Sequence, residues 1–349
     1  MARRQGASRR CGVDSKVRAT AKQLVSAGKG ILAVDDFTPG ITKRFSALNI
    51  PCTEETRRDY REMLFRAEGM QHISGVILFD ETFRQKAKDE TPIPLLVSQA
   101  GALIGIKLDQ GQKPLPFTNN EMISKGLDDL EDRLSFYKSL GTSFAKWRAV
   151  LSISDRLPSL NAMNANIHAL ARYAACCQSQ GIVPIVEPDI LMAGDHDAER
   201  CEIVTRDVLS RLFAELELAR VDLSAIVLKP NMVMAGLSCP IQAPADEVAG
   251  RTLMVLTECV PATVPGVAFL SGGQSETQAT EHLNLMVAAG ALPWQLTFSY
   301  NRALQDSALK AWAGKNENIK AGQAAFTKRA TLNSKASLGM WTPEMEIAL

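Results

Sequence analysis

Short runs of valine, isoleucine, leucine and phenylalanine recur along the chain, and each run ends at a polar or charged residue. Uninterrupted apolar runs of this length are typical of strands that are buried on both faces, as in a parallel sheet. Successive runs begin about 28 to 44 residues apart, which leaves room for a helix and two loops between neighbouring strands. The eight predicted strands are Ile31–Asp35, Gly75–Asp80, Leu103–Lys107, Phe144–Ile153, Ile182–Glu187, Ala225–Lys229, Val267–Ser271 and Gln295–Tyr300.

Helical patterns fill the segments between these runs. Thr53 is a plausible N-cap, because it directly precedes a segment that begins with two glutamates. Other segments carry apolar residues at helical spacing or are amphipathic. The predicted helices are Thr53–Leu64, Leu127–Leu140, Asn161–Gln180, Arg206–Leu218 and Ser275–Ala289.

Eight strands alternating with helices predict an α/β fold, the (β/α)8 TIM barrel, as a single domain with extra helices at its ends. Residues 1–27 would form a basic N-terminal arm and helix, and residues 28–349 the barrel, C-terminal helices and a short tail. An open doubly wound sheet is the alternative fold. No G-x-G-x-x-G follows the first strand, and no Ser/Gly-rich linker divides the chain, so the barrel is favoured.

Composition narrows the class of protein. Of 349 residues, 46% are apolar and 22% are charged, and the net charge is +1, which is typical of a soluble globular protein. This balance gives no general attraction to nucleic acid or to an anionic membrane, and no apolar run reaches the roughly 18 residues of a membrane helix. The seven cysteines form no C-x-x-C pair and the four histidines no close ligand pair. We therefore expect reduced thiols, no metal and no cofactor.

The first twenty residues are strongly basic, with six arginine and lysine side chains against Asp14 alone. A transit peptide is one interpretation, but the segment lacks a clear amphipathic repeat. An exposed basic arm on a cytoplasmic protein is favoured, and organelle targeting stays open as the alternative. The basic residues are Arg3, Arg4, Arg9, Arg10, Lys16 and Arg18.

In a barrel, the carboxyl ends of all strands meet at one mouth, where active sites form. Lys229 lies at the end of the run Ala-Ile-Val-Leu, where a charged lysine is costly unless it is paired or deprotonated. A neutral lysine can attack a ketone and form a Schiff base, whose positive nitrogen withdraws electrons from the substrate. Burial and a second cation, Lys146, would lower the pKa of Lys229, and Glu187 is the candidate acid and base. The residues delivered to the mouth are Asp35, Lys107, Lys146, Arg148, Glu187, Lys229, Ser271 and Arg302.

An anion site is predicted at the ends of the seventh and eighth strands. The segment Leu270–Ser275 contains Ser-Gly-Gly, and Ser299–Arg302 closes the next strand with an arginine. Backbone N–H groups of such loops, together with an arginine, suit a phosphate. Other polar motifs have simpler interpretations: Asp195–Asp197 as a polar loop, and Cys176 with Cys177 as core residues.

From Gly28 to about Pro343, the chain resembles the class I fructose-bisphosphate aldolases, the metal-independent Schiff-base type. The matching motifs are Gly28–Ala33, Gly75–Phe79, Phe144–Arg148, Gly181–Pro188, Gly194–Asp197, Leu228–Val233, Phe269–Ser275 and Arg302–Gln305. The resemblance implies a (β/α)8 barrel, commonly a homotetramer, that acts on a phosphorylated sugar in glycolysis and gluconeogenesis.

The resemblance also implies roles for individual residues. Lys229 matches the Schiff-base lysine, Glu187 the acid and base for dehydration, and Asp35 the carboxylate that takes the C4 hydroxyl proton. Lys146 and Arg148 match substrate-binding positions, and Lys107 matches one on the distal side. Ser271, Gly272 and Arg302 match the C1-phosphate site. Arg44 lies at a position linked to the cleft, and Asp189 lies where the family has glutamate.

The chain departs from the family after the first strand. Phe37 and Gly40 replace two hydroxyl residues expected to contact the distal phosphate, and Thr38, Lys43, Arg44 and Lys107 are the residues available to compensate. In addition, Asn301 replaces a glycine, and no tyrosine follows Tyr300. We expect reversible cleavage of fructose 1,6-bisphosphate, with fructose 1-phosphate or another 1-phosphorylated ketose as the alternative substrate. A barrel that acts mainly as a scaffold is the alternative outside enzymes.

Overall fold

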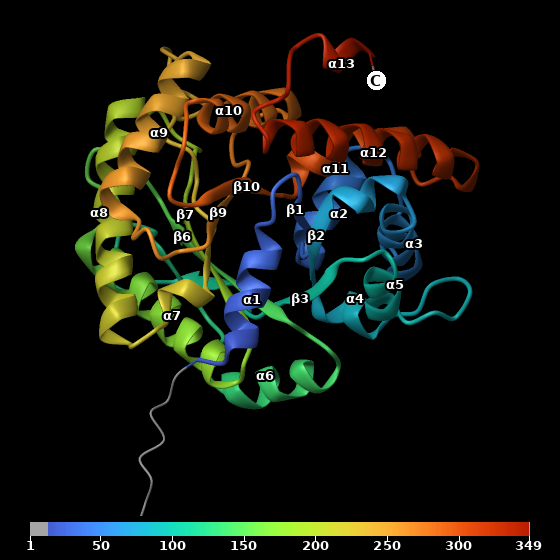
Figure 1. The fold of residues 1–349 in the computed structure, drawn as a ribbon, viewed down its shortest axis with the longest axis horizontal. Helices are drawn as coiled ribbons and strands as arrows, with labels where there is room; N and C mark the ends of the chain where they lie inside the picture. The colour runs from blue at the N-terminus through green and yellow to red at the C-terminus, as the bar shows by residue number, and fades with distance from the viewer. Residues whose placement is uncertain (1–12, 349) are drawn as a thin grey trace, which may run out of the picture.

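The computed structural model describes residues 13–348 and contains a closed barrel of eight parallel strands (Figure 1). The barrel closes because the first strand pairs with both the second and the last. All eight predicted runs form its strands, so the predicted TIM barrel is confirmed and the open sheet was wrong. The strands are β1 (Gly30–Ala33), β2 (Ile73–Leu78), β3 (Leu103–Lys107), β6 (Phe144–Leu151), β7 (Val183–Ile190), β8 (Val227–Leu228), β9 (Gly266–Phe269) and β10 (Gln295–Tyr300).

Helices surround the barrel, and their apolar faces pack on the outward side chains of the strands. Thr53 is the N-cap of its helix, as the sequence predicts, and it also forms a capping box with Thr56. The fourth predicted helix begins at Ala198 rather than at Arg206. The α-helices are α1 (Ser15–Leu24), α2 (Thr38–Ser46), α3 (Glu54–Phe65), α4 (Asp80–Arg84), α5 (Ile93–Gln99), α6 (Leu130–Ser139), α7 (Leu160–Ser179), α8 (Ala198–Leu218), α9 (Ala245–Cys259), α10 (Glu276–Ala288), α11 (Arg302–Trp312), α12 (Ile319–Ala336) and α13 (Met345–Ala348). Residues 13–348 also contain three 3-10 helices, η1 (Glu68–His72), η2 (Leu223–Ala225) and η3 (Asn316–Asn318).

Helix α1 closes the end of the barrel at which the strands begin. Leu24, at its end, and Val25 are buried in one cluster with the inward side chains of the strands. Arg18 anchors the outer face of the helix through an ion pair of 2.6 Å with Asp222. Of the other predicted basic residues of the arm, Lys16 also lies on α1, and Arg3, Arg4, Arg9 and Arg10 lie outside the described residues.

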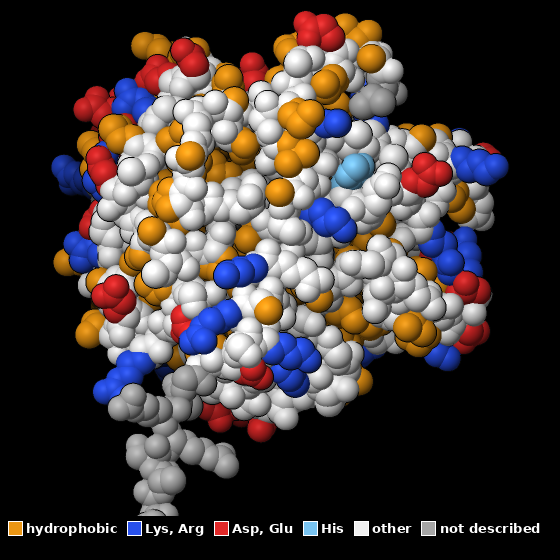
Figure 2. Space-filling view, viewed as in Figure 1, with side chains coloured by type: hydrophobic (Ala, Val, Ile, Leu, Met, Phe, Trp, Pro, Cys, Tyr) orange, Lys and Arg blue, Asp and Glu red, His pale blue; other side chains and the backbone are white. Residues whose placement is uncertain are grey.

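The surface carries no dominant charge on the face seen in Figure 2, where positive, negative and apolar side chains are interspersed. This distribution agrees with the net charge of +1. Among residues 13–348, no helix is long and apolar enough to cross a membrane.

The sequence did not predict a small antiparallel hairpin that follows β3. Its strands, β4 (Gln112–Pro114) and β5 (Met122–Ser124), have only three residues each and lie beside the barrel rather than in it. Such short strands lack the alternation of polar and apolar residues by which strands are recognised. The hairpin matters because Gln112 contributes to the cleft described below.

Inside the barrel, the ring of Phe144 on β6 occupies space that glycines on the neighbouring strands leave open. A methyl group built on Gly105 of β3 would lie 2.3 Å from ring carbons of Phe144, and one on Gly75 of β2 would lie 2.9 Å from the ring. Both distances are far inside van der Waals contact, so the two glycines are required for this packing.

We predict that Gly105→Ala lowers the free energy of unfolding by about 1–3 kcal/mol, because the added methyl group overpacks the barrel against Phe144. Chemical denaturation with far-UV circular dichroism would measure the change. Combining Gly105→Ala with Phe144→Leu should cost less than the sum of the two single changes. Strict additivity would show that Gly105 and Phe144 are not coupled.

Candidate active site

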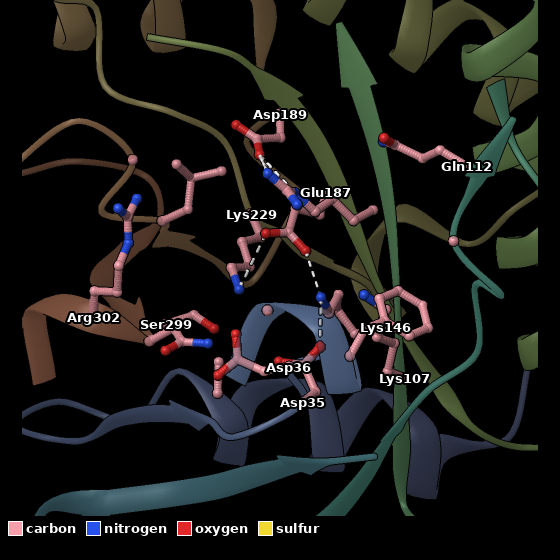
Figure 3. Close-up of a pocket in the computed structure, with 18 of the residues that line it drawn as sticks. Asp35, Asp36, Lys107, Gln112, Lys146, Glu187, Asp189, Lys229, Ser299 and Arg302 are labelled. Atoms are coloured by element: carbon pink, nitrogen blue, oxygen red, sulfur yellow. Dashed lines mark hydrogen bonds and ion pairs between the residues drawn. The ribbon is translucent and has the colours of Figure 1, made fainter. Parts of the chain in front are cut away.

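The carboxyl ends of the strands surround a cavity of about 620 Å³, and ten of the eleven predicted site residues line it. Figure 3 shows Lys229, Glu187 and Lys146 in the middle of this cleft, with Arg302 on one side and Lys107 on the other. The ten lining residues are Asp35, Lys107, Lys146, Arg148, Glu187, Asp189, Lys229, Ser271, Gly272 and Arg302.

Strand alternation explains why four of these side chains share the cleft. On β6, Lys146 and Arg148 are two residues apart, and Glu187 and Asp189 have the same spacing on β7. Residues at this spacing point to the same face of a strand. The two strands are paired with Arg148 opposite Glu187, so both pairs of side chains reach the same end of the barrel.

A continuous chain of contacts joins four buried ionisable groups. Lys146 Nζ lies 2.6 Å from Asp35 Oδ2 and 3.0 Å from Glu187 Oε2, and Lys229 Nζ lies 3.2 Å from Glu187 Oε1 (Figure 3). The four side chains are only 4–5% exposed. Since buried charges are stable only with partners, these contacts are a condition for the site to exist.

The two lysines have opposite pKa shifts. Burial lowers the pKa of Lys229, and the neighbouring ammonium of Lys146 lowers it further, against the opposing effect of Glu187. Burial also disfavours the charge of Lys146, but two carboxylates, Asp35 and Glu187, hold its pKa well above the usual value. Lys146 therefore stays a cation, whereas Lys229 is the lysine that can lose its proton.

The two carboxylates of the chain stay ionised despite their burial. Burial alone would raise the pKa of each carboxylate. For Asp35, the positive charges of Lys146, Lys107 and Lys229 outweigh the effect of burial. For Glu187, the charges of Lys146, Lys229 and Arg148 do so. Both pKa values lie below their ordinary values. Both groups can therefore act as proton acceptors at neutral pH.

Two further ion pairs flank this chain. Arg148 donates through Nε to Asp189 over 2.6 Å, which orients the guanidinium along the wall of the cleft. Lys107 Nζ lies 3.4 Å from Asp109 Oδ1, and both side chains are almost fully buried. Asp109 also accepts the backbone N–H of Arg148, so it links the end of β3 to β6.

The end of the cleft next to β9 and β10 offers free donors. Within residues 13–348, the guanidinium of Arg302 has no ion pair, and the backbone N–H groups of Gly272 and Arg302 donate to no other residue. Ser271 and Gly272 follow β9, and Arg302 begins α11. This end of the cleft has the donors and the charge that a phosphate requires.

Arg44 is the predicted residue that does not line the cavity. Its guanidinium on α2 donates to Asp36 and to the side-chain oxygen of Asn301, both over 2.9 Å, and forms an ion pair of 3.2 Å with Asp306. Asp36 and Asn301 do line the cavity. Arg44 thus holds two parts of the wall together, and Asn301, in place of a glycine, supplies one of its acceptors.

Several lining residues were not predicted from the sequence. Gln110, Gly111, Gln112 and Lys125 come from β4, β5 and the loops beside them, and neither strand was predicted. Asp109 does not line this cavity but pairs with Lys107; it lies two residues beyond the predicted strand end, and that spacing was the signal available for finding it. Within the described part of the chain, no group of three or more metal-ligating side chains is present.

The simpler interpretations of two other motifs agree with the structure. Asp197 is the N-cap of α8, and its carboxylate accepts the backbone N–H of Arg200 over 2.7 Å. Cys177 is fully buried in the core, and Cys176 is half-buried on the same helix. Neither motif belongs to the cleft.

Comparison with known proteins gives a consistent result. The model of the family "Fructose-bisphosphate aldolase class-I" matches residues 16–348. A probable class 1 fructose-bisphosphate aldolase of Xanthomonas campestris is 48% identical over 324 residues, which are 92% of this chain and 97% of that protein. Fructose-bisphosphate aldolase B of Gallus gallus is 49% identical, over 92% of this chain and 89% of its own length.

A solved structure supports the same conclusion. The fructose-bisphosphate aldolase of Plasmodium falciparum, crystallised with TRAP and a small-molecule inhibitor, superimposes with a TM-score of 0.92 at 43% identity. The match covers 94% of this chain and 95% of the other. With the closed barrel and the charged cleft at its mouth, these matches show that the chain belongs to the class I fructose-bisphosphate aldolase family.

Proposed function

We propose that this protein cleaves fructose 1,6-bisphosphate reversibly to dihydroxyacetone phosphate and glyceraldehyde 3-phosphate through a Schiff base on Lys229. The main support for the proposal is that the pKa values of the two central lysines are shifted in opposite directions. Lys229 contacts one carboxylate and has a lowered pKa, whereas Lys146 contacts two and has a raised pKa. A deprotonatable amine beside a fixed cation is what nucleophilic attack on a ketone needs.

The proposed reaction begins when the neutral amine of Lys229 adds to the C2 carbonyl of the ketose. Glu187 lies 3.2 Å from the Lys229 nitrogen, so it can take the proton that Lys229 loses on becoming neutral and return it to the carbinolamine hydroxyl, which then leaves as water. The resulting iminium accepts the electron pair of the C3–C4 bond as that bond breaks. Asp35, held by Lys146, takes the proton of the C4 hydroxyl, and the aldehyde leaves. Protonation of the enamine at C3 and hydrolysis of the iminium then release dihydroxyacetone phosphate and restore the lysine.

Substrate orientation follows from the asymmetry of the cleft. A phosphate on C1 would lie at Ser271, Gly272 and Arg302, where the free donors are. The aldehyde half of the substrate would then extend toward Lys107 on the opposite side (Figure 3). Arg148, oriented by Asp189, lines the wall between the two ends.

Family membership also leads us to propose a cytoplasmic homotetramer that acts in glycolysis and gluconeogenesis. Large apolar side chains are exposed on the outer helices, including Ile203 and Leu218 on α8 and Met254 on α9. A subunit interface would bury such side chains, which are unfavourable in water.

We predict that borohydride traps dihydroxyacetone phosphate on Lys229, because reduction of a Schiff base makes the carbon–nitrogen bond permanent. Peptide mapping by mass spectrometry would locate the adduct. Lys310→Met, which removes an exposed lysine of α11, is the matched control and should leave the adduct in place. An adduct on another lysine, or none at all, would show that the assignment to Lys229 is wrong.

We predict that Lys146→Met moves the pH dependence of Schiff-base formation to higher pH. Removing the neighbouring ammonium leaves Glu187 to stabilise protonated Lys229, so the pKa of Lys229 rises and less of the amine is neutral at a given pH. The initial rate of trapping by cyanoborohydride, followed across a pH series, gives the midpoint. A midpoint that stays constant or moves to lower pH would contradict the role of Lys146 as the second cation.

We predict that Arg302→Ala weakens dihydroxyacetone phosphate binding about tenfold or more, because a charge-assisted contact to the phosphate is lost. The concentration of dihydroxyacetone phosphate that gives half-maximal trapping measures the effect, and trapping at saturation should persist. If only the aldehyde substrate binds more weakly, the two ends of the cleft are assigned the wrong way round.

A further inference from the structure

The two ends of the cleft differ in how their positive charges are compensated. At one end, Arg302 has no ion pair within the described residues. At the other, Lys107 is paired with Asp109 at 3.4 Å, and its side chain is only 7% exposed. A cation whose charge is already matched by a buried carboxylate has little attraction left for a second anion.

An aromatic ring also covers Lys107. The Nζ atom of Lys107 lies 3.9 Å from the centre of the Phe37 ring, which is within the range of a cation–π contact. The Phe37 ring is also in T-shaped contact with the Phe79 ring, with 5.4 Å between ring centres. Phe37 thus contacts both Lys107 and Phe79, and it lines the cleft.

The start of α2 offers few donors to an anion at this end. Phe37 is its N-cap and provides no side-chain hydrogen bond. Pro39 has no N–H, and the N–H of Gly40 donates to the carbonyl oxygen of Phe37 over 2.8 Å. Of the first three helical residues, Thr38 alone therefore has an N–H that is free within the described residues.

Phe37 also separates two cavities. It lines the active-site cleft and, together with Lys107 and Gln110, an adjoining cavity of about 560 Å³ with aromatic and charged walls. The Phe37 ring therefore lies between the two cavities. A substrate that extends past Lys107 would have to pass this ring.

We propose that Phe37 determines the specificity of the aldehyde end, and that the unphosphorylated aldehyde of a ketose 1-phosphate fits there nearly as well as a phosphorylated one. This inference rests on the proposed Schiff-base reaction and names the substrate class of that same site. A hydroxylated aldehyde requires no compensating cation, and the Phe37 ring withholds Lys107 from a phosphate. The protein then cleaves fructose 1-phosphate with an efficiency close to that for the bisphosphate.

The test compares kcat/KM for fructose 1,6-bisphosphate and fructose 1-phosphate in the natural chain and in Phe37→Ser. Serine uncovers Lys107 and adds a hydroxyl donor, so the preference for the bisphosphate should rise about tenfold or more. Phe37→Leu, which keeps the apolar bulk, should leave the preference small. Phe117→Ser, which removes an exposed phenylalanine outside the cleft, is the matched control and should change neither substrate.

A second measurement needs no variant at Phe37. In the condensation direction, the natural chain should join dihydroxyacetone phosphate to glyceraldehyde and to glyceraldehyde 3-phosphate with similar kcat/KM. Lys125, an exposed cation that also lines the cleft, is another residue that a distal phosphate could reach. Under this proposal, Lys125→Met has little effect on the ratio of the two substrates.

Three results would overturn the inference. They are a several-hundredfold preference for the bisphosphate in the natural chain, a preference that Phe37→Ser leaves unchanged, and a preference that disappears in Lys125→Met. Each would leave the proposed function intact if borohydride still traps dihydroxyacetone phosphate on Lys229. Absence of both trapping and cleavage would instead contradict the proposed function itself.

Discussion

Glu187 forms ion pairs with two lysines, Lys146 and Lys229, and the arrangement of the barrel strands brings the three side chains together. The oxygens of Glu187 lie 3.0 Å from Lys146, within β6, and 3.2 Å from Lys229, which directly follows β8. Removing one partner from such a buried group costs about 3–5 kcal/mol, so the lysines and the carboxylate are mutually dependent. The register of β6 and β7 is constrained as well, because a slip by one residue would turn Glu187 and Lys146 away from the cleft.

The same interaction makes two chemically identical side chains different. Lys146 and Lys229 are equally buried, and only the number of carboxylates beside each distinguishes them. One extra carboxylate, Asp35, fixes the charge of Lys146 and leaves Lys229 with the lowered pKa. The neighbouring charges, rather than the residue type, thus determine which lysine is neutral and which is charged. Active sites commonly obtain acid and base groups near neutral pH in this way.

The barrel and most of its site were predictable because they depend on local patterns. Strands buried on both faces are recognised by uninterrupted apolar runs, and a charged residue at the end of a run, such as Lys229, is delivered to the mouth by the fold itself. The hairpin of β4 and β5 was missed because three-residue strands have no recognisable period.

Other features depend on contacts between residues far apart in sequence. The assignment of Arg44 to the cleft came from the resemblance to the aldolase family, whereas its contact with Asn301 arises only when α2 and the start of α11 meet. The replacement at position 37 was visible in the sequence. That its ring would lie over Lys107 was not, because the contact depends on how β3 and the start of α2 approach each other.

Closure of the barrel through β1 and β10 has a consequence for synthesis on the ribosome. β1 (Gly30–Ala33) is made long before its partner strand β10, which ends at Tyr300. Until Tyr300 has left the ribosome, one edge of β1 has no partner. Helix α1 likewise lacks the contact of Arg18 with Asp222 until the segment of η2 is made. Unpaired edges and exposed apolar helices invite aggregation. Segments made before Tyr300 therefore need protection from aggregation, and the barrel can close only once β10 has left the ribosome.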